Sequence, residues 1–127
     1  MTVPTVLVVD DDDSVREITV LALEVVAGWR VIAAGGGVEA LELARAHRPD
    51  AVLLDVMMPE MDGPTTLRHL QADEATRDIP VILLTAKVLT GERQQWEELA
   101  IRGVIAKPFD PMGLHTEVAR LAGWSVA

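Results

Sequence analysis

The 127-residue sequence contains no cysteine, which excludes disulfides, thiolate nucleophiles and zinc–thiolate sites. Basic residues are few: 11 Lys and Arg stand against 20 Asp and Glu, so the formal net charge is −9. A field of this sign repels phosphate backbones, and we expect no direct nucleic-acid binding. The sequence also lacks a secretory signal and the run of roughly 18 apolar residues that a membrane span requires. These absences predict a cytoplasmic protein that does not enter a membrane.

The remaining composition is that of a globular domain. Half of the residues are apolar and 24% are charged, and the apolar residues are spread along the chain. A chain of this length can bury a core of its own without disulfides or metal staples. We therefore expect a single domain over residues 1–127, with its core at about 5–122 and no attached output domain.

Five short apolar runs predict strands. Each is rich in Val, Ile and Leu, and none alternates cleanly between apolar and polar residues, which is typical of parallel strands covered on both faces. The runs are "TVLVV" (5–9), "WRVIAA" (29–34), "AVLLD" (51–55), "PVILLT" (80–85) and "GVIAK" (103–107).

Stretches with helical periodicity follow each run. Their apolar faces are predicted at Val15, Ile18, Ala22, Val25 and Val26; at Val38, Leu41 and Ala44; at Leu67 and Leu70; at Leu89, Trp96, Leu99 and Ala100; and at Leu114, Val118, Leu121 and Ala122. The order is therefore strand–helix five times over. This order predicts an α/β fold, in which a doubly wound, five-stranded parallel sheet carries helices on both faces.

Polar side chains stand where the predicted strands end. Because the carboxyl ends of parallel strands meet at one edge of the sheet, we expect these side chains to be neighbours. They are Asp10, Asp11, Asp55, Thr85 and Lys107. Clustered carboxylates without thiol or imidazole partners suit a hard cation, and Mg²⁺ is the natural candidate because it needs few protein ligands. Beside such an ion, a carboxylate could attack phosphorus while an ammonium and a hydroxyl bind the phosphoryl oxygens.

Several segments of the chain resemble a known family. "VLVVDDD", "AVLLDVMMPEMDG", "PVILLTA" and "IAKPFD", with "GVEAL" in the second helix, are similar to the receiver domain of two-component response regulators over about residues 5–122. The resemblance implies a flavodoxin-like fold of receiver type. It also implies that Asp55 accepts a phosphoryl group from a sensor histidine kinase or a phosphotransfer protein. Such a domain is a regulator and not an enzyme, with at most slow self-phosphorylation and self-dephosphorylation.

The resemblance further implies a role for each residue at the strand ends. Asp11 and Asp55 would bind Mg²⁺ directly, together with the backbone carbonyl of Met57, and Asp10 would act mostly through water. Thr85 would close on the phosphoryl group.

The resemblance also implies that Lys107 pairs with the phosphoryl group and that the Lys107–Pro108 peptide is cis. One position departs from the family pattern, because Val104 stands where a Tyr or Phe switch residue is common. We therefore expect the signal to pass through the segment after Thr85 and the fourth helix. An unidentified downstream protein would bind the fourth helix, fifth strand and fifth helix, and the sequence leaves open whether the chain forms a homodimer.

Neighbouring residues have simpler interpretations. Asp12 and Asp13 are predicted to cap the first helix, and "SVRE" fits a capping box between Ser14 and Glu17. In "PEMDG" we expect a turn in which Gly63 relieves a strained backbone conformation. The three histidines are predicted to be neither ligands nor bases; they are His47, His69 and His115.

Other functions compete with this interpretation. "GGGVEA" (35–40) fits the dinucleotide-binding pattern G-x-G-x-x-A, with Asp55 about 20 residues further on, although the pattern normally belongs to the first strand–helix turn. An aspartyl-phosphate phosphohydrolase would share the acids and the lysine. It would also need a second acid two positions after its nucleophile, where Met57 stands. A receiver-like interaction module that is never phosphorylated is the third alternative.

Overall fold

A computed structural model of the protein describes residues 3–86 and 101–124. Five parallel strands form one sheet in the order β2-β1-β3-β4-β5. The strands are β1 (Thr5–Val9), β2 (Arg30–Ala34), β3 (Ala51–Asp55), β4 (Val81–Thr85) and β5 (Gly103–Ala106). The predicted parallel, doubly wound sheet is therefore confirmed, and its strand order is that of flavodoxin-like folds.

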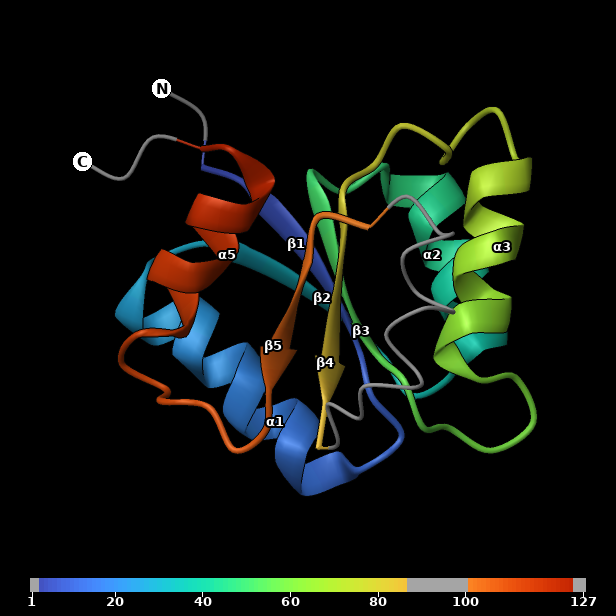
Figure 1. Ribbon diagram of the computed structural model, residues 1–127. Coiled ribbons are helices and arrows are strands. Elements are labelled where there is room, and N and C mark those ends of the chain that lie inside the picture. Colours follow the sequence, from blue (N-terminus) through green and yellow to red (C-terminus); the bar gives the residue numbers. More distant parts are fainter. Residues whose placement is uncertain (1–2, 87–100, 125–127) are drawn as a thin grey trace.

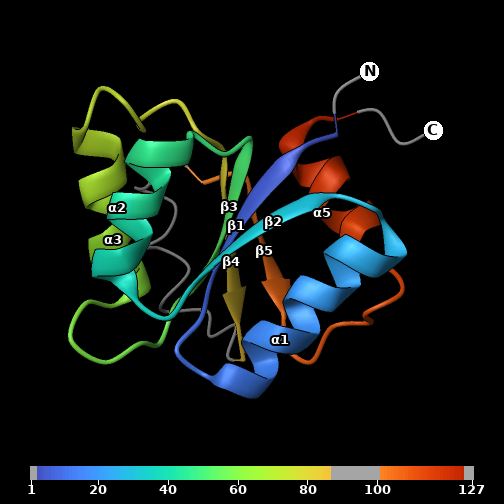
Figure 2. The same ribbon diagram turned by 180° about the vertical axis from the view of Figure 1, so that it is seen from behind.

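Helices cover both faces of this sheet (Figure 1). On one face lie α1 (Asp13–Leu21), its π-helical continuation η1 (Ala22–Val26) and α5 (Leu114–Ala122); on the other lie α2 (Gly37–His47) and α3 (Gly63–Ala72). Figure 2 shows the same two layers from behind. The predicted fourth helix, marked by Leu89, Trp96, Leu99 and Ala100, lies outside the described residues. Within the described ranges, no helix combines the length and the apolar character that crossing a bilayer requires.

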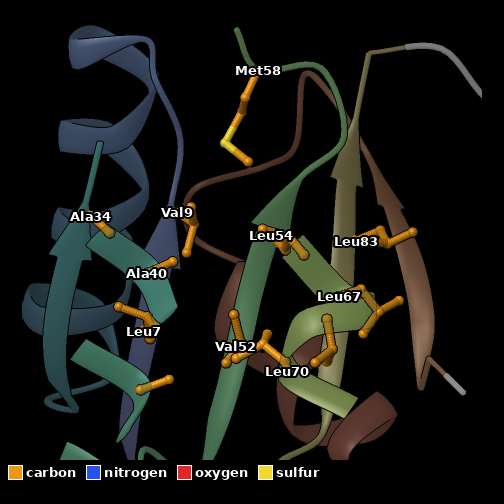
Figure 3. Packing of buried hydrophobic residues seen from close by; sticks show 12 residues of the cluster. Leu7, Val9, Ala34, Ala40, Val52, Leu54, Met58, Leu67, Leu70 and Leu83 are labelled. Atoms are coloured by element: carbon orange, nitrogen blue, oxygen red, sulfur yellow. The ribbon is translucent and has the colours of Figure 1, made fainter. Parts of the chain in front are cut away.

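Both faces of the central strands are buried. Alternate strand residues meet α2 and α3 on one side (Figure 3): Leu7, Val9, Val52, Leu54 and Leu83, packed against Ala40, Leu67 and Leu70. The residues between them face α1, η1 and α5: Val6, Val8, Leu53, Ile82 and Leu84, packed against Leu23, Leu114 and Val118. Burial on two sides explains why the strand sequences are continuous apolar runs without alternation.

The first helix begins one residue before the predicted capping box. Asp12 is extended, with φ −82° and ψ 113°, and its carboxylate accepts hydrogen bonds from the N–H groups of Ser14 (2.9 Å) and Val15 (3.1 Å). Ser14 consequently lies inside the first turn, and the predicted box with Glu17 is wrong. The predicted capping role of Asp12 is confirmed, whereas Asp13 is not a cap: it lies in the first turn, where its negative charge favours the helix dipole.

The buried face of this helix differs from the predicted one. Ile18 and Val25 are 48% and 74% exposed, whereas Thr19 and Leu23 are fully buried. Thr19 can be buried because its hydroxyl donates to the Val15 carbonyl at 2.7 Å. A pattern of apolar residues could not detect a face centred on a threonine.

Helix α2 approaches α3 closely at Gly37. A Cβ atom on Gly37 would lie 2.9 Å from the Sδ atom of Met61 and would also collide with the side chain of Thr66. Val38, predicted on the buried face, is 55% exposed, while Ala40 is fully buried. The sheet-facing side of α2 thus uses small residues, because the helix lies so close to its neighbours.

An aromatic contact joins the start of β2 to the end of the chain. The indole of Trp29 packs edge to face against Trp124, with ring centroids 5.4 Å apart, and against the His115 ring at 6.2 Å. The pair ties the η1–β2 turn to α5. The His115 ring therefore contributes to packing at this contact.

Candidate functional site

The site lies at the edge of the sheet where the strands end, at the lower edge of Figure 1. Asp10 directly follows β1, Asp55 ends β3, Thr85 ends β4 and Lys107 directly follows β5. These strands are adjacent in the order β1-β3-β4-β5. Residues up to 97 positions apart in the sequence therefore become neighbours, as the parallel topology predicts.

Three carboxyl groups form the centre of the site. Asp10, Asp11 and Asp55 each offer an oxygen, and these oxygens all lie within 4.8 Å of one another. Asp10 and Asp55 are buried, whereas Asp11 is exposed. Carboxylates this close repel one another, and burial prevents water from screening the repulsion.

Lys107 bridges two of these carboxylates. Its Nζ donates to Oδ2 of Asp10 at 2.8 Å and to Oδ1 of Asp55 at 3.2 Å, and its side chain is only 15% exposed. The Lys107–Pro108 peptide that follows is cis, as predicted. The lysine thus connects the ends of β5, β1 and β3.

The single positive charge of Lys107 does not neutralise the negative charges of the carboxylates in the site. Burial and, after it, the negative charge of Asp10 raise the pKa of Asp55, while Lys107 and the backbone N–H of Met57 lower it; the net result is a pKa raised from 3.8 to about 6. Burial by itself would lower the pKa of Lys107, but its hydrogen bonds and charge interactions with Asp10 and Asp55 hold that pKa above 10.5. The lysine therefore remains charged, and the site still has an excess of negative charge.

Asp10 has all its polar groups engaged. Oδ1 accepts from the N–H of Asp12 at 2.9 Å, and Oδ2 accepts from Lys107. Its backbone N–H donates to the Ala34 carbonyl at 3.1 Å, and its own carbonyl accepts from Nη1 of Arg16 at 2.9 Å. Asp11, in contrast, is exposed at the rim and is the more available of the two for direct coordination.

The connection from β3 to α3 passes close beneath Asp55. Asp62 caps α3 and accepts from the Thr65 N–H at 2.8 Å, and Gly63 donates its N–H to the Val56 carbonyl at 2.9 Å. A Cβ atom on Gly63 would lie 2.5 Å from the Asp55 carbonyl oxygen and 2.8 Å from Cα of Val56. Gly63 does not have a positive φ, so the predicted backbone strain is wrong. Glycine is required here because two backbone segments approach closely.

The other predicted residues surround this centre. Thr85 is buried at the end of β4, and Met57 is 68% exposed beside Asp55. Val104 is partly buried and packs against the core on the α2–α3 face. The segment after Ala86 that was predicted to carry the signal lies outside the described residues.

The glycine-rich turn after β2 has a structural explanation. β2 is an edge strand, Gly35 donates its N–H to the Glu39 carboxylate at 3.0 Å, and Gly37 provides the close approach of α2 to α3. An N–H that would face a pyrophosphate is thus bonded to the protein's own side chain. The dinucleotide-binding interpretation is not favoured.

One basic residue of the site escaped the sequence analysis. Arg16 reaches back from α1 to the Asp10 carbonyl and to the carboxylate of Asp13. The available signal was a single arginine one turn into a helix that starts with aspartates. Sequence alone does not say in which direction such a side chain turns.

The donor set fits a small divalent cation. Three carboxylates converge, and no thiol or imidazole belongs to the group. Mg²⁺ prefers oxygen ligands and keeps several of its waters, so few protein groups suffice. Asp11 and Asp55 are the residues that could hold such an ion, with Asp10 and Lys107 beside it.

Comparison with known sequences agrees with this chemistry. The family model described as the response regulator receiver domain matches residues 6–119. Response regulator Rre1 of Synechocystis sp. is 36% identical over 117 residues, which are 92% of this chain and 51% of that protein. The chain spans about half the length of the curated relatives it matches.

Solved structures are similar over nearly the whole chain. Chemotaxis protein CheY4 of Vibrio cholerae has a TM-score of 0.89 at 30% identity, covering 94% of this chain and 99% of that one. The receiver domain of sensor histidine kinase PA1611 from Pseudomonas aeruginosa has a TM-score of 0.82 at 31% identity, covering 96% and 99%. The latter structure holds a magnesium ion coordinated in its active site cleft.

Proposed function

The chain belongs to the response regulator receiver domain family, and on this basis we propose that it is the phosphoacceptor of a two-component phosphorelay. The observation that carries the proposal is the contact of Lys107 with Asp55 and Asp10, beside the exposed Asp11. This arrangement combines a nucleophilic carboxylate, a cation for phosphoryl oxygens and oxygen ligands for a metal. Residues 1–127 would act as one receiver domain.

In the proposed reaction, an oxygen of the Asp55 carboxylate attacks the phosphorus of a phosphohistidine. The P–N bond breaks, the imidazole leaves with the bonding electron pair and takes up a proton, and an acyl phosphate forms on Asp55. Bound Mg²⁺ would neutralise charge on the phosphoryl oxygens, held by Asp11, Asp55 and the carbonyl of Met57. Asp10 would act on the ion mostly through water.

Two further side chains would hold the phosphoryl group. Lys107 can exchange its 3.2 Å contact with Asp55 for a phosphoryl oxygen while its 2.8 Å contact with Asp10 keeps it in place. The Thr85 hydroxyl would donate to another oxygen from the end of β4. Together these interactions would shift an equilibrium between two conformations of the domain.

The partners follow from the reaction. The donor would be a sensor histidine kinase or a phosphotransfer protein, the domain would act in the cytoplasm, and the phosphorylated form would bind a downstream protein. With a net charge of −9, the domain would not contact nucleic acid directly. Self-dephosphorylation would be slow, because Met57 offers no acid or base near the acyl phosphate.

Acetyl phosphate with Mg²⁺ provides the direct test. We expect one hydroxylamine-sensitive phosphoryl adduct, mapped to Asp55 by mass spectrometry, and we expect none with EDTA or in Asp55→Asn. The exposed loop variant Asp78→Asn is the matched control and should be phosphorylated normally. Absence of an adduct under every condition would refute the proposal, and rapid multiple-turnover release of phosphate would favour a phosphohydrolase.

A further inference from the structure

An arginine on the first helix turns back over the acidic connection between β1 and α1. Nη1 of Arg16 donates to the Asp10 carbonyl at 2.9 Å, and Nη2 donates to Oδ1 of Asp13 at 2.5 Å. The Arg16 side chain is 24% exposed, while its partner Asp13 is 90% exposed. A Cβ atom on Gly35 would lie 3.7 Å from Nη1, so the guanidinium also sits against the β2–α2 connection.

The contact of Arg16 with the Asp10 carbonyl lies directly after the last backbone hydrogen bond between β1 and β2. The ladder between β1 and β2 ends as the Asp10 N–H donates to the Ala34 carbonyl. The next backbone acceptor, the carbonyl of Asp10, lies beyond the strand and accepts from Arg16. The arginine thus fixes the first peptide unit of the connection that carries the acids.

That peptide unit also sets the direction of Asp11. The carbonyl of Asp10 and the N–H of Asp11 belong to one planar peptide group. The hydrogen bond from Arg16 to this carbonyl therefore fixes the orientation of the peptide plane that leads into Asp11. Asp11 is exposed, and its carboxylate has no hydrogen bond within residues 3–86 and 101–124. Its position close to Asp10 and Asp55 therefore depends on the backbone.

We infer that Arg16 is a positioning residue for the metal site, which holds Asp11 in place through the Asp10–Asp11 peptide. This inference rests on the proposed function, because it concerns the affinity of the same site for Mg²⁺. The role resembles that of outer-shell groups in metal sites, which orient the ligands without touching the ion.

A counter-charge role and a positioning role of Arg16 predict opposite changes in Mg²⁺ affinity when the arginine is removed. The guanidinium is a cation that contacts the Asp10 carbonyl next to the proposed metal site, so its charge opposes the binding of a second cation. If Arg16 acted only as a counter-charge, its removal would tighten Mg²⁺ binding. If it positions Asp11, its removal weakens binding although the site becomes more negative.

The test is a calorimetric titration of the unphosphorylated protein with Mg²⁺, together with the backbone amide shifts of Asp11. Arg16→Met keeps an apolar stem and removes every donor, and we expect roughly 10-fold weaker Mg²⁺ binding and a displaced Asp11 amide signal. Arg120→Met is the matched control, because Arg120 forms the same kind of i,i+3 ion pair with Glu117 on α5. It should bind Mg²⁺ like the unchanged protein.

Unchanged or tighter Mg²⁺ binding by a folded Arg16→Met protein would overturn the inference and leave the proposed function intact. Failure of the unchanged protein to bind Mg²⁺ would overturn both. Should Arg16→Met not fold, Arg16→Lys decides the question. It retains the charge but cannot reach both acceptors with a planar fork, so weaker binding supports positioning and unchanged affinity refutes it.

Discussion

The protonation of Asp55 links the chemistry of the site to the stability of the fold. Its ionised form is disfavoured by burial and by Asp10, and the charge of Lys107 and its hydrogen bond to Asp55 compensate only in part. A nucleophile must be ionised to attack phosphorus. The charge that the proposed attack of Asp55 on phosphorus requires therefore destabilises the metal-free fold.

Asp55→Asn should stabilise the metal-free protein, and more so at higher pH. The pKa of Asp55 rises from 3.8 to about 6 in the folded state, so the folded state binds the proton more tightly than the unfolded chain. The contribution of this group to the free energy of unfolding therefore falls as pH rises from 3.8 to about 6. We expect a gain of about 1–3 kcal/mol above pH 6 and little change near pH 4.

Urea unfolding in EDTA at the two pH values measures this difference. Asp78→Asn, which removes a charge from an exposed loop, is the control. It should change the free energy of unfolding only slightly, and by the same amount at the two pH values. If Asp55→Asn is no more stable than the unchanged protein above pH 6, the charge of Asp55 does not strain the fold.

Gly63→Ala should damage both stability and the site. The new Cβ would lie 2.5 Å from the Asp55 carbonyl oxygen, a backbone atom that cannot rotate away. We expect a loss of about 1–3 kcal/mol in the free energy of unfolding and slower phosphorylation of Asp55. Gly36→Ala is the control, since nothing lies within 4 Å of its Cβ position, and it should behave like the unchanged protein. Equal behaviour of the two variants would argue against the close approach.

At the start of α1, two neighbouring acids, Asp11 and Asp12, have separate tasks. Asp12 accepts the hydrogen bonds of the first turn, while Asp11 points to the site and forms no hydrogen bond in the described chain. Stability and metal binding should therefore respond to different members of one acidic run.

Asp12→Ala should cost about 1 kcal/mol of unfolding free energy while Mg²⁺ binding is largely kept, because a helix cap is lost. Asp12→Asn removes the same charge but retains a capping oxygen, so its stability should stay close to that of the unchanged protein. Chemical denaturation of both variants, with Mg²⁺ titration of each, makes the comparison. If the Asn variant is as unstable as the Ala variant, charge and not capping explains the effect.

The elements differ in how far sequence could predict them. The strands were predictable because burial on both faces leaves continuous apolar runs, and the topology then brought Asp10, Asp55 and Lys107 together. The buried face of α1 was less predictable, since it includes Thr19 with a hydroxyl bonded to its own helix. The roles of Arg16 and Gly63 depend on contacts between separate segments, which no local pattern records.

For the molecule as a whole, bound Mg²⁺ should act as a stabilising ligand. A ligand present at 100 times its dissociation constant stabilises the folded state by about 2.7 kcal/mol. We expect the melting temperature to rise with Mg²⁺ relative to EDTA, and Asp11→Asn to abolish most of that rise. NaCl at matched ionic strength is the control for screening. Equal stabilisation by NaCl would mean that the acidic cluster is merely screened.

The contact between Trp29 and Trp124 has a practical consequence for following the fold in solution. The two indoles are 95 positions apart in the sequence, and their ring centroids lie 5.4 Å apart only when α5 is seated against the η1–β2 turn. Transition dipoles at this distance couple, so the pair should contribute an exciton band to the circular dichroism spectrum. That band would report, without any attached label, whether α5 is packed against the η1–β2 turn.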